Sequence, residues 1–537
     1  MNAHARPGPD TTVTQLSRTI SPTAAMAAIL AIGTIMRIVN AASIGLGVDE
    51  SYVTTVSRTL SLSYFDHPPL HYWIIHATAW LTGTEHPVVI RLPFIAIFAL
   101  TTWLMYRLTA KLCDPWSGVA AALLLNLSAV FSLTTGGWAL PDGPLMAALL
   151  AAALVLANIL LPRELRVDAR HERHKMLGAW SLAGLFGGLA MLSKYHGVFL
   201  FVGVLVFLLS HRGSRHWLTS PGPWIGALIA AAVASPVLIW NIQHDFVSIA
   251  FQGGRGAPGD ELRPDRILSN IAGQAAWILP WIFVPLAWVF VRAALAGPGD
   301  PRRWFLVCLG AGPILVFTIV VMWGSRGLFH WQAPGWLMIF PLLGAAVAGR
   351  LRSGNAVTRW WLTASAVLLA AITIILATHT ATGWIRAAVP TFEGSDPTVE
   401  ALTWRELRVA LESSDLLDGG DRFVVALHWL EGGKIGQALG PDMPIVCFCS
   451  DPRHFAFMAD PSTFEGRDAV IIGRRDTIDR HGEAAADRFA GTGPRHDITI
   501  DRGGRAEVPV SFIPVRDLLE PYRLPYPDRF DRDSHGR

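Results

Sequence analysis

The sequence predicts a polytopic α-helical membrane protein with a small α/β domain at its C-terminal end. Hydrophobic residues make up 52% of the 537-residue chain and charged residues only 16%, which is far from the composition of soluble proteins. The 21 tryptophans are abundant near the ends of apolar segments, as interfacial anchors are. The formal net charge of +3 is small and gives no indication of a nucleic-acid partner.

The apolar segments suffice for about eleven membrane spans, since a helix of roughly 20 residues crosses the hydrocarbon core. A polar tail, 1–23, precedes them. The fifth and sixth spans are short and are separated by Lys194-Tyr195-His196-Gly197, so a single broken helix is the alternative there. Together the spans fill a transmembrane region, 24–382, and are expected at 24–44, 88–110, 116–137, 143–161, 178–193, 197–211, 222–241, 271–292, 304–323, 331–349 and 359–380.

The basic residues predict the orientation of the chain. Arginines and lysines gather in alternate loops, which all become cytoplasmic if the N-terminus is cytoplasmic. Merging the fifth and sixth spans would reverse everything downstream and break this pattern, so we expect two separate spans. The long loops 45–87 and 242–270 then lie on the outer side, and so does the C-terminus.

The first outer loop, 45–87, is more than a polar connector. Asp49-Glu50 follows the first span at once, and acidic groups beside a bilayer are costly and commonly mark a site. A solvated loop is the alternative that the local sequence leaves open. The apolar stretch Leu70 to Leu81 is too short to span and suits a helix in the membrane interface. Pro68-Pro69 fits the start of this helix, where missing N–H groups cost little.

The composition changes after about residue 383, where charged residues, Gly and Pro become frequent. Short β-rich runs alternate with helical patterns, which indicates a small α/β domain over 383–537 on the outer side. We expect strands over 422–427, 444–449, 469–472 and 508–513, and helices over 398–413 and 431–439.

The predicted topology brings many polar residues to the outer face. Each has a structural alternative: Arg58 and Arg91 suit snorkelling side chains, and Asp142 suits a helix cap. His244 and His330 suit solvated loops. Together the set suits a lipid-phosphate substrate, because a phosphate needs cations and an acceptor hydroxyl needs a general base. Its members are Asp49, Glu50, Arg58, Asp66, His67, Arg91, Asp142, Lys194, Tyr195, His196, Asn241, His244, Asp245, Arg255, Arg326 and His330.

Residue types suggest roles within this set. Lys194, Arg255 and Arg326 are the expected phosphate ligands, since arginine binds phosphate in a bidentate manner. Asp49 is the expected general base, and Asp142 would orient the acceptor or the base. The sequence has no phosphate-cradling glycine loop and no Ser-His-Asp order that would favour other chemistry.

The motifs, in this order, resemble those of a known family. The stretches 49–52 (DESY), 64–70 (YFDHPPL) and 89–93 (VIRLP) are similar to the N-terminal half of the bacterial branch of the protein O-mannosyltransferase superfamily. This branch includes the lipid A aminoarabinose transferase and related galacturonosyltransferases. The match continues through 141–144 (PDGP), 192–195 (LSKY), 236–245 (PVLIWNIQHD) and 330–331 (HW).

The resemblance implies a GT-C fold and an inverting glycosyltransferase in the bacterial inner membrane. Such enzymes take a sugar from a polyprenyl-phosphate carrier at the outer face, and lipid A, another glycan or a protein would accept it. The resemblance implies that Asp49 is the catalytic base with Glu50 beside it, that Asp142 is the second acid, and that Lys194 is the basic residue of the fifth-to-sixth connection. We also expect Arg58 at the donor phosphate, and substrate contacts from Tyr52, Tyr64, Asp66, His67, Tyr195, His244 and His330.

His67 departs from the related sequences. The aminoarabinose transferase-like branch usually has Lys at this position, in a Glu-Lys-Pro-Pro motif, so the Asp-His-Pro-Pro found here weighs against an aminoarabinose donor. Asp66, His67 and His244 are also candidate ligands for a divalent metal ion. Hydrogen-bonded loop residues are the alternative, and the sequence leaves both open.

A polytopic lipid-phosphate transporter or flippase without transferase activity is the alternative function. Transporters, however, usually place charges near the bilayer midplane and show paired inverted halves. Here the charges gather at one face, and no half of the sequence repeats the other. A receptor-like scaffold would leave this ring of charge unexplained.

Overall fold

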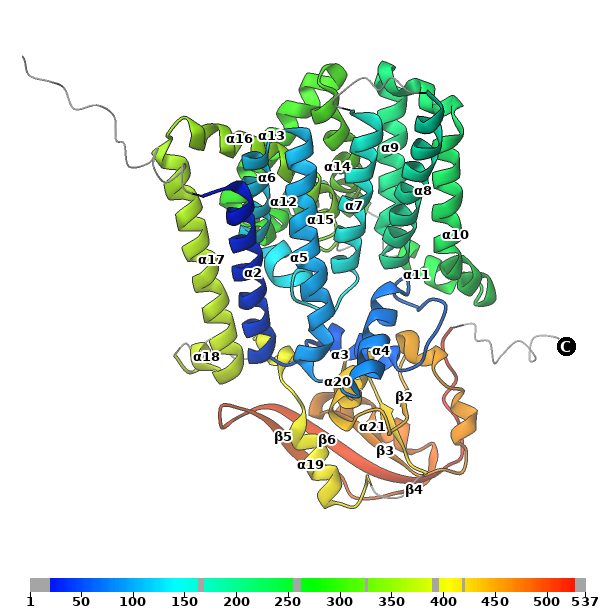
Figure 1. Cartoon of the computed structure of the whole chain (residues 1–537). Coiled ribbons are helices and arrows are strands. Elements are labelled where there is room, and N and C mark those ends of the chain that lie inside the picture. The colour runs from blue at the N-terminus through cyan, green and yellow to red at the C-terminus, as the bar shows by residue number, and fades with distance from the viewer. Residues whose placement is uncertain are drawn as a thin grey trace, which may run out of the picture.

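A bundle of long helices stands on a smaller C-terminal sheet domain (Figure 1). The computed structural model describes residues 20–162, 169–254, 262–323, 327–388, 396–417 and 421–526. The chain is mainly helical, and the expected fold class is confirmed.

Nine of the described helical segments are long and apolar enough to cross a membrane, which makes the chain a multi-pass membrane protein. Proline in the first turn starts most of these helices, because its missing N–H has no partner there in any case. The spans lie in α2 (Pro22–Ser43), α5 (Pro87–Leu112), α7 (Asp142–Leu160), α8 (Ala169–Ser193), α10 (Pro221–Gln243), α13 (Pro280–Ala296), α14 (Pro301–Ile319), the segment Ala333–Arg352, which includes α16 (Phe340–Arg352), and α17 (Ala356–Thr382).

The predicted third and sixth spans are apolar helices that are shorter than a full crossing. The third is α6 (Pro115–Leu127), which is followed by the π-helical turn η1 (Val130–Thr135). The sixth is α9 (Val198–Ser210), which continues into η3 (Arg212–Thr219) through a bend of 115°. The short turn η2 (Tyr195–Gly197) separates α8 from α9, so the chain does break where the sequence predicted.

The predicted span over 271–292 is two helices. α12 (Asp265–Ile278) ends at Leu279, whose φ of +83° does not fit a helix, and α13 begins at Pro280. The sequence did not predict this break, because the hydrophobic run continues through it. Short helices α11 (Val247–Gly254), α15 (Ala333–Leu337) and α18 (Trp384–Ala388) and the turns η4 (Gly297–Gly299) and η5 (Val320–Trp323) complete the described membrane region.

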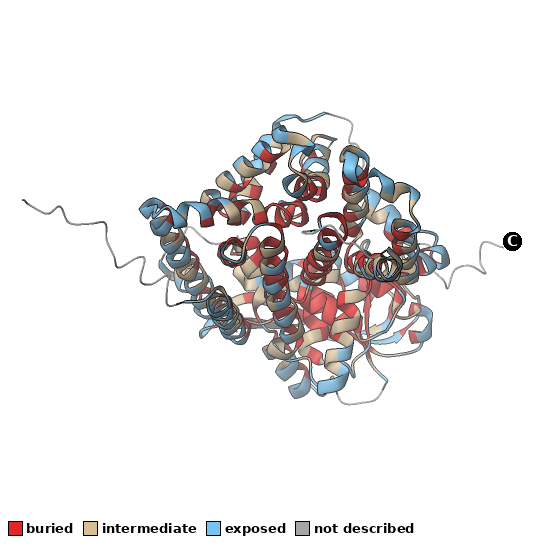
Figure 2. Ribbon diagram, turned by 45° about the horizontal axis from the view of Figure 1, so that its top comes forward, coloured by how far each residue is buried: buried red, intermediate tan, exposed pale blue. Residues whose placement is uncertain are grey.

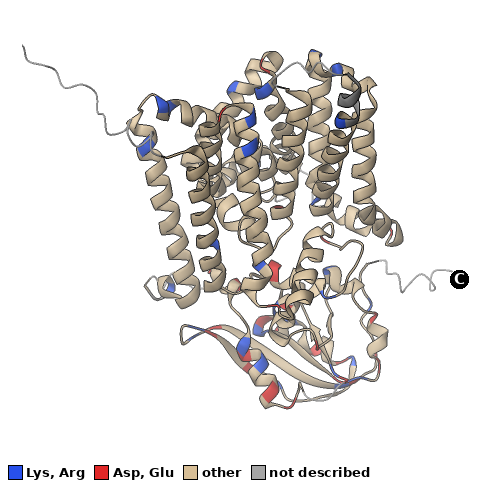
Figure 3. Cartoon of the chain, viewed as in Figure 1, with Lys and Arg blue, Asp and Glu red and all other residues tan. Residues whose placement is uncertain are grey.

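The outer faces of the peripheral helices are exposed and apolar. Buried residues concentrate inside the bundle and at its junction with the sheet domain (Figure 2), whereas Ile35 on α2 is 61% exposed. Charged side chains gather near the helix ends and in the sheet domain and leave the middle of the bundle almost uncharged (Figure 3). Apolar faces of this extent suit contact with lipid.

Two helices form the ordered part of the first outer loop. α3 (Val48–Ser57) begins directly after the first span, and α4 (Leu70–Thr82) is the short helix that the sequence predicted. Pro69 is the N-cap of α4, and Gly83 ends the helix with a φ of +67°.

The C-terminal domain contains a six-stranded mixed sheet. Its strands are β1 (Phe423–Ala426), β2 (Ile445–Cys447), β3 (Ala469–Arg474), β4 (Phe489–Thr492), β5 (His496–Arg502) and β6 (Arg505–Leu518). The strand order is β2-β1-β3-β6-β4, with β5 also paired to β6; β1 is parallel to β2 and β3, and β6 is antiparallel to its neighbours.

Four of these strands are the predicted ones, whereas β4 and β5 are not anticipated by the sequence. The predicted helix over 431–439 is α20 (Trp429–Leu439). The predicted helix over 398–413 is divided into the turn η7 (Pro397–Ala401) and α19 (Arg405–Ser413). An unpredicted helix, α21 (Arg475–Ala486), and the turns η8 (Arg453–Phe457) and η9 (Pro461–Phe464) complete the described part of this domain.

The first outer loop and the C-terminal domain share one hydrophobic core. Tyr52 and Val56 of α3 belong to the same buried cluster as Ile435 of α20. The two helices meet closely at Gly433, where a Cβ atom would lie 2.6 Å from the Tyr52 Cα. The predicted boundary at 383 therefore marks a change in composition, while the packing runs across it.

Candidate functional site

Asp49 lies in the first turn of α3 at the edge of a cavity of about 360 Å³. The cavity lies between α2, α17 and the turn η7, and its walls are mostly apolar, with Trp138, Trp277 and Leu376 among them. Asp49 is exposed, and no ion pair involves it within the described parts of the chain. A carboxylate in this position can meet a hydroxyl group that a lipid-like molecule brings into the cavity.

The surroundings raise the pKa of Asp49 to about 6. The main cause is desolvation, because the protein around the cavity replaces bulk water even though the carboxylate itself remains accessible. The neighbouring carboxylates of Asp66 and Glu400 raise the pKa further, and Arg453 lowers it. A general base works best when its pKa is near the operating pH, so this shift suits proton transfer.

Glu50 turns away from Asp49 into the protein. Its side chain is 2% exposed, and its two oxygens accept hydrogen bonds from Arg91 Nε (2.8 Å) and Arg91 Nη2 (2.5 Å). The same oxygens accept from the backbone N–H groups of Ala139 and Gly47, each at 3.0 Å. Because its oxygens are fully engaged, the geometry favours a positioning role for Glu50 over the predicted catalytic one.

Asp142 and Lys194 form a buried ion pair. The Lys194 ammonium lies 3.0 Å from each oxygen of Asp142, which begins α7. His196 and His330 are close enough to act electrostatically on Asp142. The fold thus brings together side chains from three separate parts of the sequence, all of which belong to the predicted set of polar residues at the outer face.

His71 connects this ion pair to the first loop. It interacts with the charges of both Asp142 and Lys194, and its ring centroid lies 5.9 Å from that of the predicted His67. Burial lowers the pKa of His71 to about 3, although Asp142 opposes the shift. His71 is therefore a neutral imidazole at physiological pH.

The C-terminal domain contributes Arg453 to the loop. The two carboxylate oxygens of Asp66 accept hydrogen bonds from Arg453 (2.5 Å) and from the Tyr52 hydroxyl. Arg453 also pairs with Asp451 at 2.9 Å and stacks over Trp429 at 4.4 Å. Its φ of +52° is unfavourable for a side chain of this size, so these contacts hold it in a strained conformation.

The other predicted residues have partners within the protein. Tyr64 stacks on Tyr72 with ring centroids 3.8 Å apart, and the Tyr195 hydroxyl lies 2.8 Å from Ser248 Oγ. His244 stacks on Trp240, with ring centroids 4.2 Å apart.

Arg58 does not join the group around Lys194. Its guanidinium binds Glu85 through two hydrogen bonds of 2.8 and 2.6 Å and donates to the Gly436 carbonyl at 2.8 Å. These contacts join α3 to α20, and the donor-phosphate role of Arg58 stays a prediction. The other two predicted phosphate ligands, Arg255 and Arg326, lie outside the described residues.

Within the described residues, no group of three or more His, Cys, Asp or Glu side chains is arranged to hold a metal ion. The weak candidates were Asp66, His67 and His244, and both oxygens of Asp66 are already hydrogen-bonded. A divalent metal ion, which the sequence left open beside hydrogen-bonded loop residues, therefore has no support from the described geometry.

Several residues of the site were not predicted. Tyr72 has a buried hydroxyl with no hydrogen-bond partner among the described residues, and the charges of Asp66 and Asp49 act on it electrostatically. A sequence signal existed for His71 and Tyr72, because they follow the motif at 64–70 on a predicted helix. Arg453 and Glu400 had no such signal, since only the fold brings the C-terminal domain to the first loop.

The architecture is that of the GT-C class of integral membrane proteins. The crystal structure of ArnT from Cupriavidus metallidurans in the apo state superposes with a TM-score of 0.60, at 13% sequence identity, and covers 91% of this chain and 97% of that one. The form bound to undecaprenyl phosphate superposes with a TM-score of 0.56 at 14% identity, over the same shares of the two chains. At such low identity this likeness shows the fold alone.

Sequence comparison adds relatives. Residues 66–240 match the family described as "Dolichyl-phosphate-mannose-protein mannosyltransferase". The lipid A galacturonosyltransferase RgtD of Rhizobium johnstonii is 27% identical over 281 residues, which are 51% of this chain and 54% of the relative. Undecaprenyl phosphate-alpha-4-amino-4-deoxy-L-arabinose arabinosyl transferase 1 of Proteus mirabilis is 24% identical over 246 residues, 42% and 41% of the two chains.

The chain spans about half the length of the curated relatives it matches. The resemblance that the motifs indicated, to the superfamily of protein O-mannosyltransferases and aminoarabinose transferases, is confirmed by the family match and these relatives.

Proposed function

We propose that this protein is an inverting glycosyltransferase that moves a sugar from a polyprenyl-phosphate carrier to a lipid or glycan acceptor of the cell envelope. The observation that carries the proposal is Asp49, an accessible carboxylate with a pKa near 6 at the edge of an apolar cavity. The relatives' names, a lipid A galacturonosyltransferase and an undecaprenyl-phosphate arabinosyl transferase, support this donor class and make lipid A the preferred acceptor.

Asp49 would act as the general base. It accepts the proton of the acceptor hydroxyl while the hydroxyl oxygen forms a bond to the anomeric carbon of the sugar. The bond between that carbon and the phosphate oxygen breaks, and the phosphate leaves with the electron pair. Attack opposite the leaving phosphate inverts the configuration of the sugar.

Lys194 would stabilise the charge of the leaving phosphate. The Lys194 ammonium group has three N–H donors, and both of its contacts with Asp142 go to the same carboxylate. Asp142 therefore fixes the position of the cation, and His71 remains a neutral hydrogen-bonding group beside it. A pre-positioned cation stabilises developing charge without reorganisation during the reaction.

We place the protein in the bacterial inner membrane, with the N-terminus cytoplasmic and the C-terminal domain periplasmic. The basic residues of the alternate loops support this orientation through the positive-inside rule. With this orientation, Asp49 and the sheet domain lie on the outer side of the membrane. The family that the motifs resemble uses polyprenyl-phosphate sugars on that side.

The Asp49→Asn variant tests the proposal because it keeps the shape of the side chain and removes the base. We expect transfer from a polyprenyl-phosphate sugar to lipid A to fall by at least roughly 100-fold, the lower end of typical general-base contributions. The measurement is mass spectrometry of lipid A after incubation of purified enzyme with donor and acceptor.

Asp442→Asn is the matched control, because Asp442 is an exposed aspartate just before β2. It should retain wild-type transfer. If Asp49→Asn and Asp442→Asn transfer sugar at the same rate as the wild-type enzyme, Asp49 is not the base. If none of the three proteins, each folded and supplied with both substrates, transfers sugar, the transferase proposal fails.

A further inference from the structure

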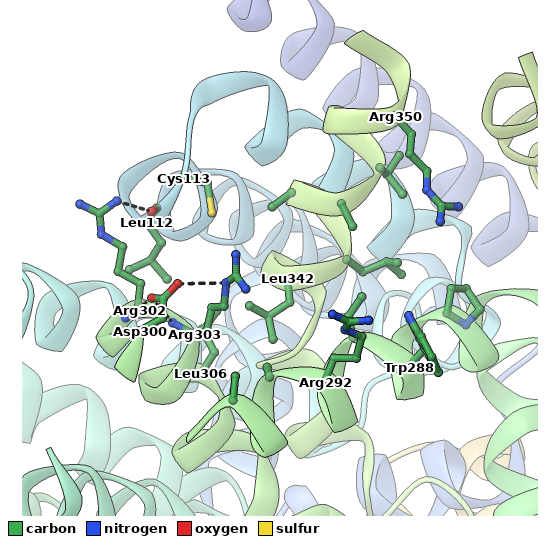
Figure 4. Close-up of a pocket in the computed structure, with 18 of the residues that line it drawn as sticks. Leu112, Cys113, Trp288, Arg292, Asp300, Arg302, Arg303, Leu306, Leu342 and Arg350 are labelled. Carbon is green, nitrogen blue, oxygen red and sulfur yellow. Dashed lines mark hydrogen bonds and ion pairs between the residues drawn. The ribbon is translucent and has the colours of Figure 1, made fainter. Parts of the chain in front are cut away.

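A second and larger cavity lies at the opposite end of the helix bundle from Asp49. Its volume is about 880 Å³, and it is formed where α5 ends and α14 begins, between α13, α16 and the first turns of α17 (Figure 4). The chain enters α5 beside the first outer loop and leaves it at this cavity, so α5 separates the two sites along the bundle (Figure 1). The transferase mechanism uses none of its residues.

Four arginines surround the cavity. Arg302 and Arg303 lie on one side of it, and Arg292 and Arg350 lie on the other (Figure 4). Asp300 is the single acidic residue among the described lining residues; it pairs with Arg303 at 3.0 Å and also caps α14. Arg302 donates to the Leu112 carbonyl at 3.2 Å. The cavity therefore carries an excess of positive charge.

The walls between the arginines are apolar and aromatic. Trp281, Trp288 and Trp361 line the cavity together with Pro285 and Leu342. Trp288 is 62% exposed, and the Arg292 guanidinium lies 5.8 Å from its ring centroid. An inorganic anion would contact only the arginines, whereas a lipid would contact the arginines with its headgroup and the apolar walls with its acyl chains.

We propose that this cavity binds an anionic phospholipid. The phosphate group would lie between Arg292, Arg350 and Arg303, because guanidinium groups bind phosphate oxygens through charge-assisted hydrogen bonds. The acyl chains would lie along Trp281, Leu342 and Trp361. Basic pockets between membrane helices are suited to such headgroups, and the attraction falls with each arginine removed.

The test is lipid binding to the purified full-length chain in detergent, measured by native mass spectrometry. Dioleoylphosphatidylglycerol is the anionic probe, and dioleoylphosphatidylcholine is its zwitterionic counterpart. We expect the wild-type chain to retain the anionic lipid preferentially. The double variant Arg292→Gln with Arg350→Gln should bind it roughly tenfold or more weakly, since each arginine near a headgroup contributes to the affinity.

A matched double control is Arg107→Gln with Arg359→Gln. Arg107 stacks on Trp103 at 4.9 Å, as Arg292 does on Trp288, and Arg359 is an exposed residue on α17; neither lines the cavity. This control should bind phosphatidylglycerol as the wild-type chain does. Equal losses in both double variants would mean a general effect of basic surface charge and would overturn the proposed site.

Three further measurements test the site. A phosphatidylglycerol with a photoreactive group in its acyl chain should crosslink to α13 and α16 in the wild-type chain, and crosslinks confined to other helices would reject the site. Inorganic phosphate at millimolar concentration should not displace the lipid; full displacement would identify a free-anion site instead. The phospholipid should also raise the unfolding temperature of the wild-type chain more than that of the Arg292/Arg350 variant.

Discussion

Two adjacent carboxylates, Asp49 and Glu50, have opposite environments. The Arg91 pair and two backbone N–H groups hold the pKa of Glu50 below its usual value in spite of complete burial. Asp49 has no such partners among the described residues, and its pKa is raised. Environments that separate the pKa values of neighbouring acids indicate different roles, here a fixed charge and an exchangeable proton.

The raised pKa of Asp49 predicts a pH dependence of the transfer rate. A general base must be deprotonated, and at pH 6 about half of the Asp49 side chains carry a proton. The rate should therefore be maximal above about pH 7 and fall about tenfold per pH unit well below pH 6. Measuring kcat/KM for the acceptor between pH 5 and pH 8 tests this expectation, and an unchanged rate down to pH 5 would contradict it.

Tyr72 and Tyr52 are a matched pair for testing the site around Asp66. The Tyr52 hydroxyl is hydrogen-bonded to Asp66 and to the backbone N–H of His454, whereas the Tyr72 hydroxyl is buried and has no hydrogen-bond partner in the described parts of the chain. Tyr52→Phe should lower the free energy of unfolding by about 1–3 kcal/mol, because it leaves buried groups unpaired. Tyr72→Phe should leave stability unchanged or raise it.

An activity measurement on Tyr72→Phe shows whether the Tyr72 hydroxyl binds the substrate. A buried polar group without a partner suggests that a substrate supplies one, so Tyr72→Phe should reduce transfer while the unfolding temperature holds. The two measurements are transfer by mass spectrometry and thermal unfolding in detergent. Full activity in Tyr72→Phe would show that the hydroxyl does not meet the substrate.

At the scale of elements, long apolar runs and proline positions allowed most helices to be predicted, together with the interfacial helix α4. The π-helical turn after α6 and the break at Leu279 could not be foreseen, because both lie inside continuous hydrophobic sequence. β4 and β5 also escaped prediction. β5 pairs with β6 and contains several charged residues, and its two buried residues are Ile500 and the charged Arg502.

The site was predicted only where its residues lie in recognisable local motifs. Asp49, Asp142 and Lys194 lie at the ends of apolar segments, so their position near the membrane face could be inferred. The partner of Glu50 is Arg91, 41 residues away, and the partner of Asp66 is Arg453, 387 residues away. Pairings across such separations are set by tertiary packing and leave no periodic signal in the sequence.

The ion pair between Glu50 and Arg91 fixes the start of α3. Removing one member of a buried pair leaves an uncompensated charge, which costs about 3–5 kcal/mol. Glu50→Gln should therefore lower the unfolding temperature strongly and reduce transfer by misplacing Asp49. Glu85→Gln is the matched control, because its pair with Arg58 is more exposed and should cost about 1 kcal/mol. Equal losses of stability in the two variants would contradict this assignment.

At the scale of the whole molecule, two of the contacts that join the C-terminal domain to the membrane region lie at the end of α17 and near Asp49. Asp396 accepts hydrogen bonds from Arg502 of β5 at 2.8 Å, and it pairs with His379 at the end of α17 at 3.0 Å. Near Asp49, Lys434 of α20 donates to the carbonyls of Leu46 and Leu402, at 2.5 and 2.9 Å. The second junction lies directly before α3, so the sheet domain helps to set the position of the proposed base.

Gly433 allows this second junction to close. An alanine there would place its Cβ 2.6 Å from the backbone of Tyr52, so α20 must move away from α3. We expect Gly433→Ala to reduce transfer severalfold or more and to increase hydrogen exchange in both helices. Gly349→Ala is the control: this glycine of α16 has open space around it, and an alanine should stabilise the helix by about 0.5–1 kcal/mol without affecting transfer.

The two readouts for Gly433→Ala distinguish a structural role of the C-terminal domain from a role in positioning the base. Faster hydrogen exchange with wild-type transfer would mean that α20 supports α3 without setting the geometry of Asp49. Loss of transfer with faster exchange confined to α20 and α3 would mean that the close contact at Gly433 holds Asp49 in place. The sheet domain would then be an integral part of the catalytic unit, because α20 and the Glu50–Arg91 pair would together hold the start of α3.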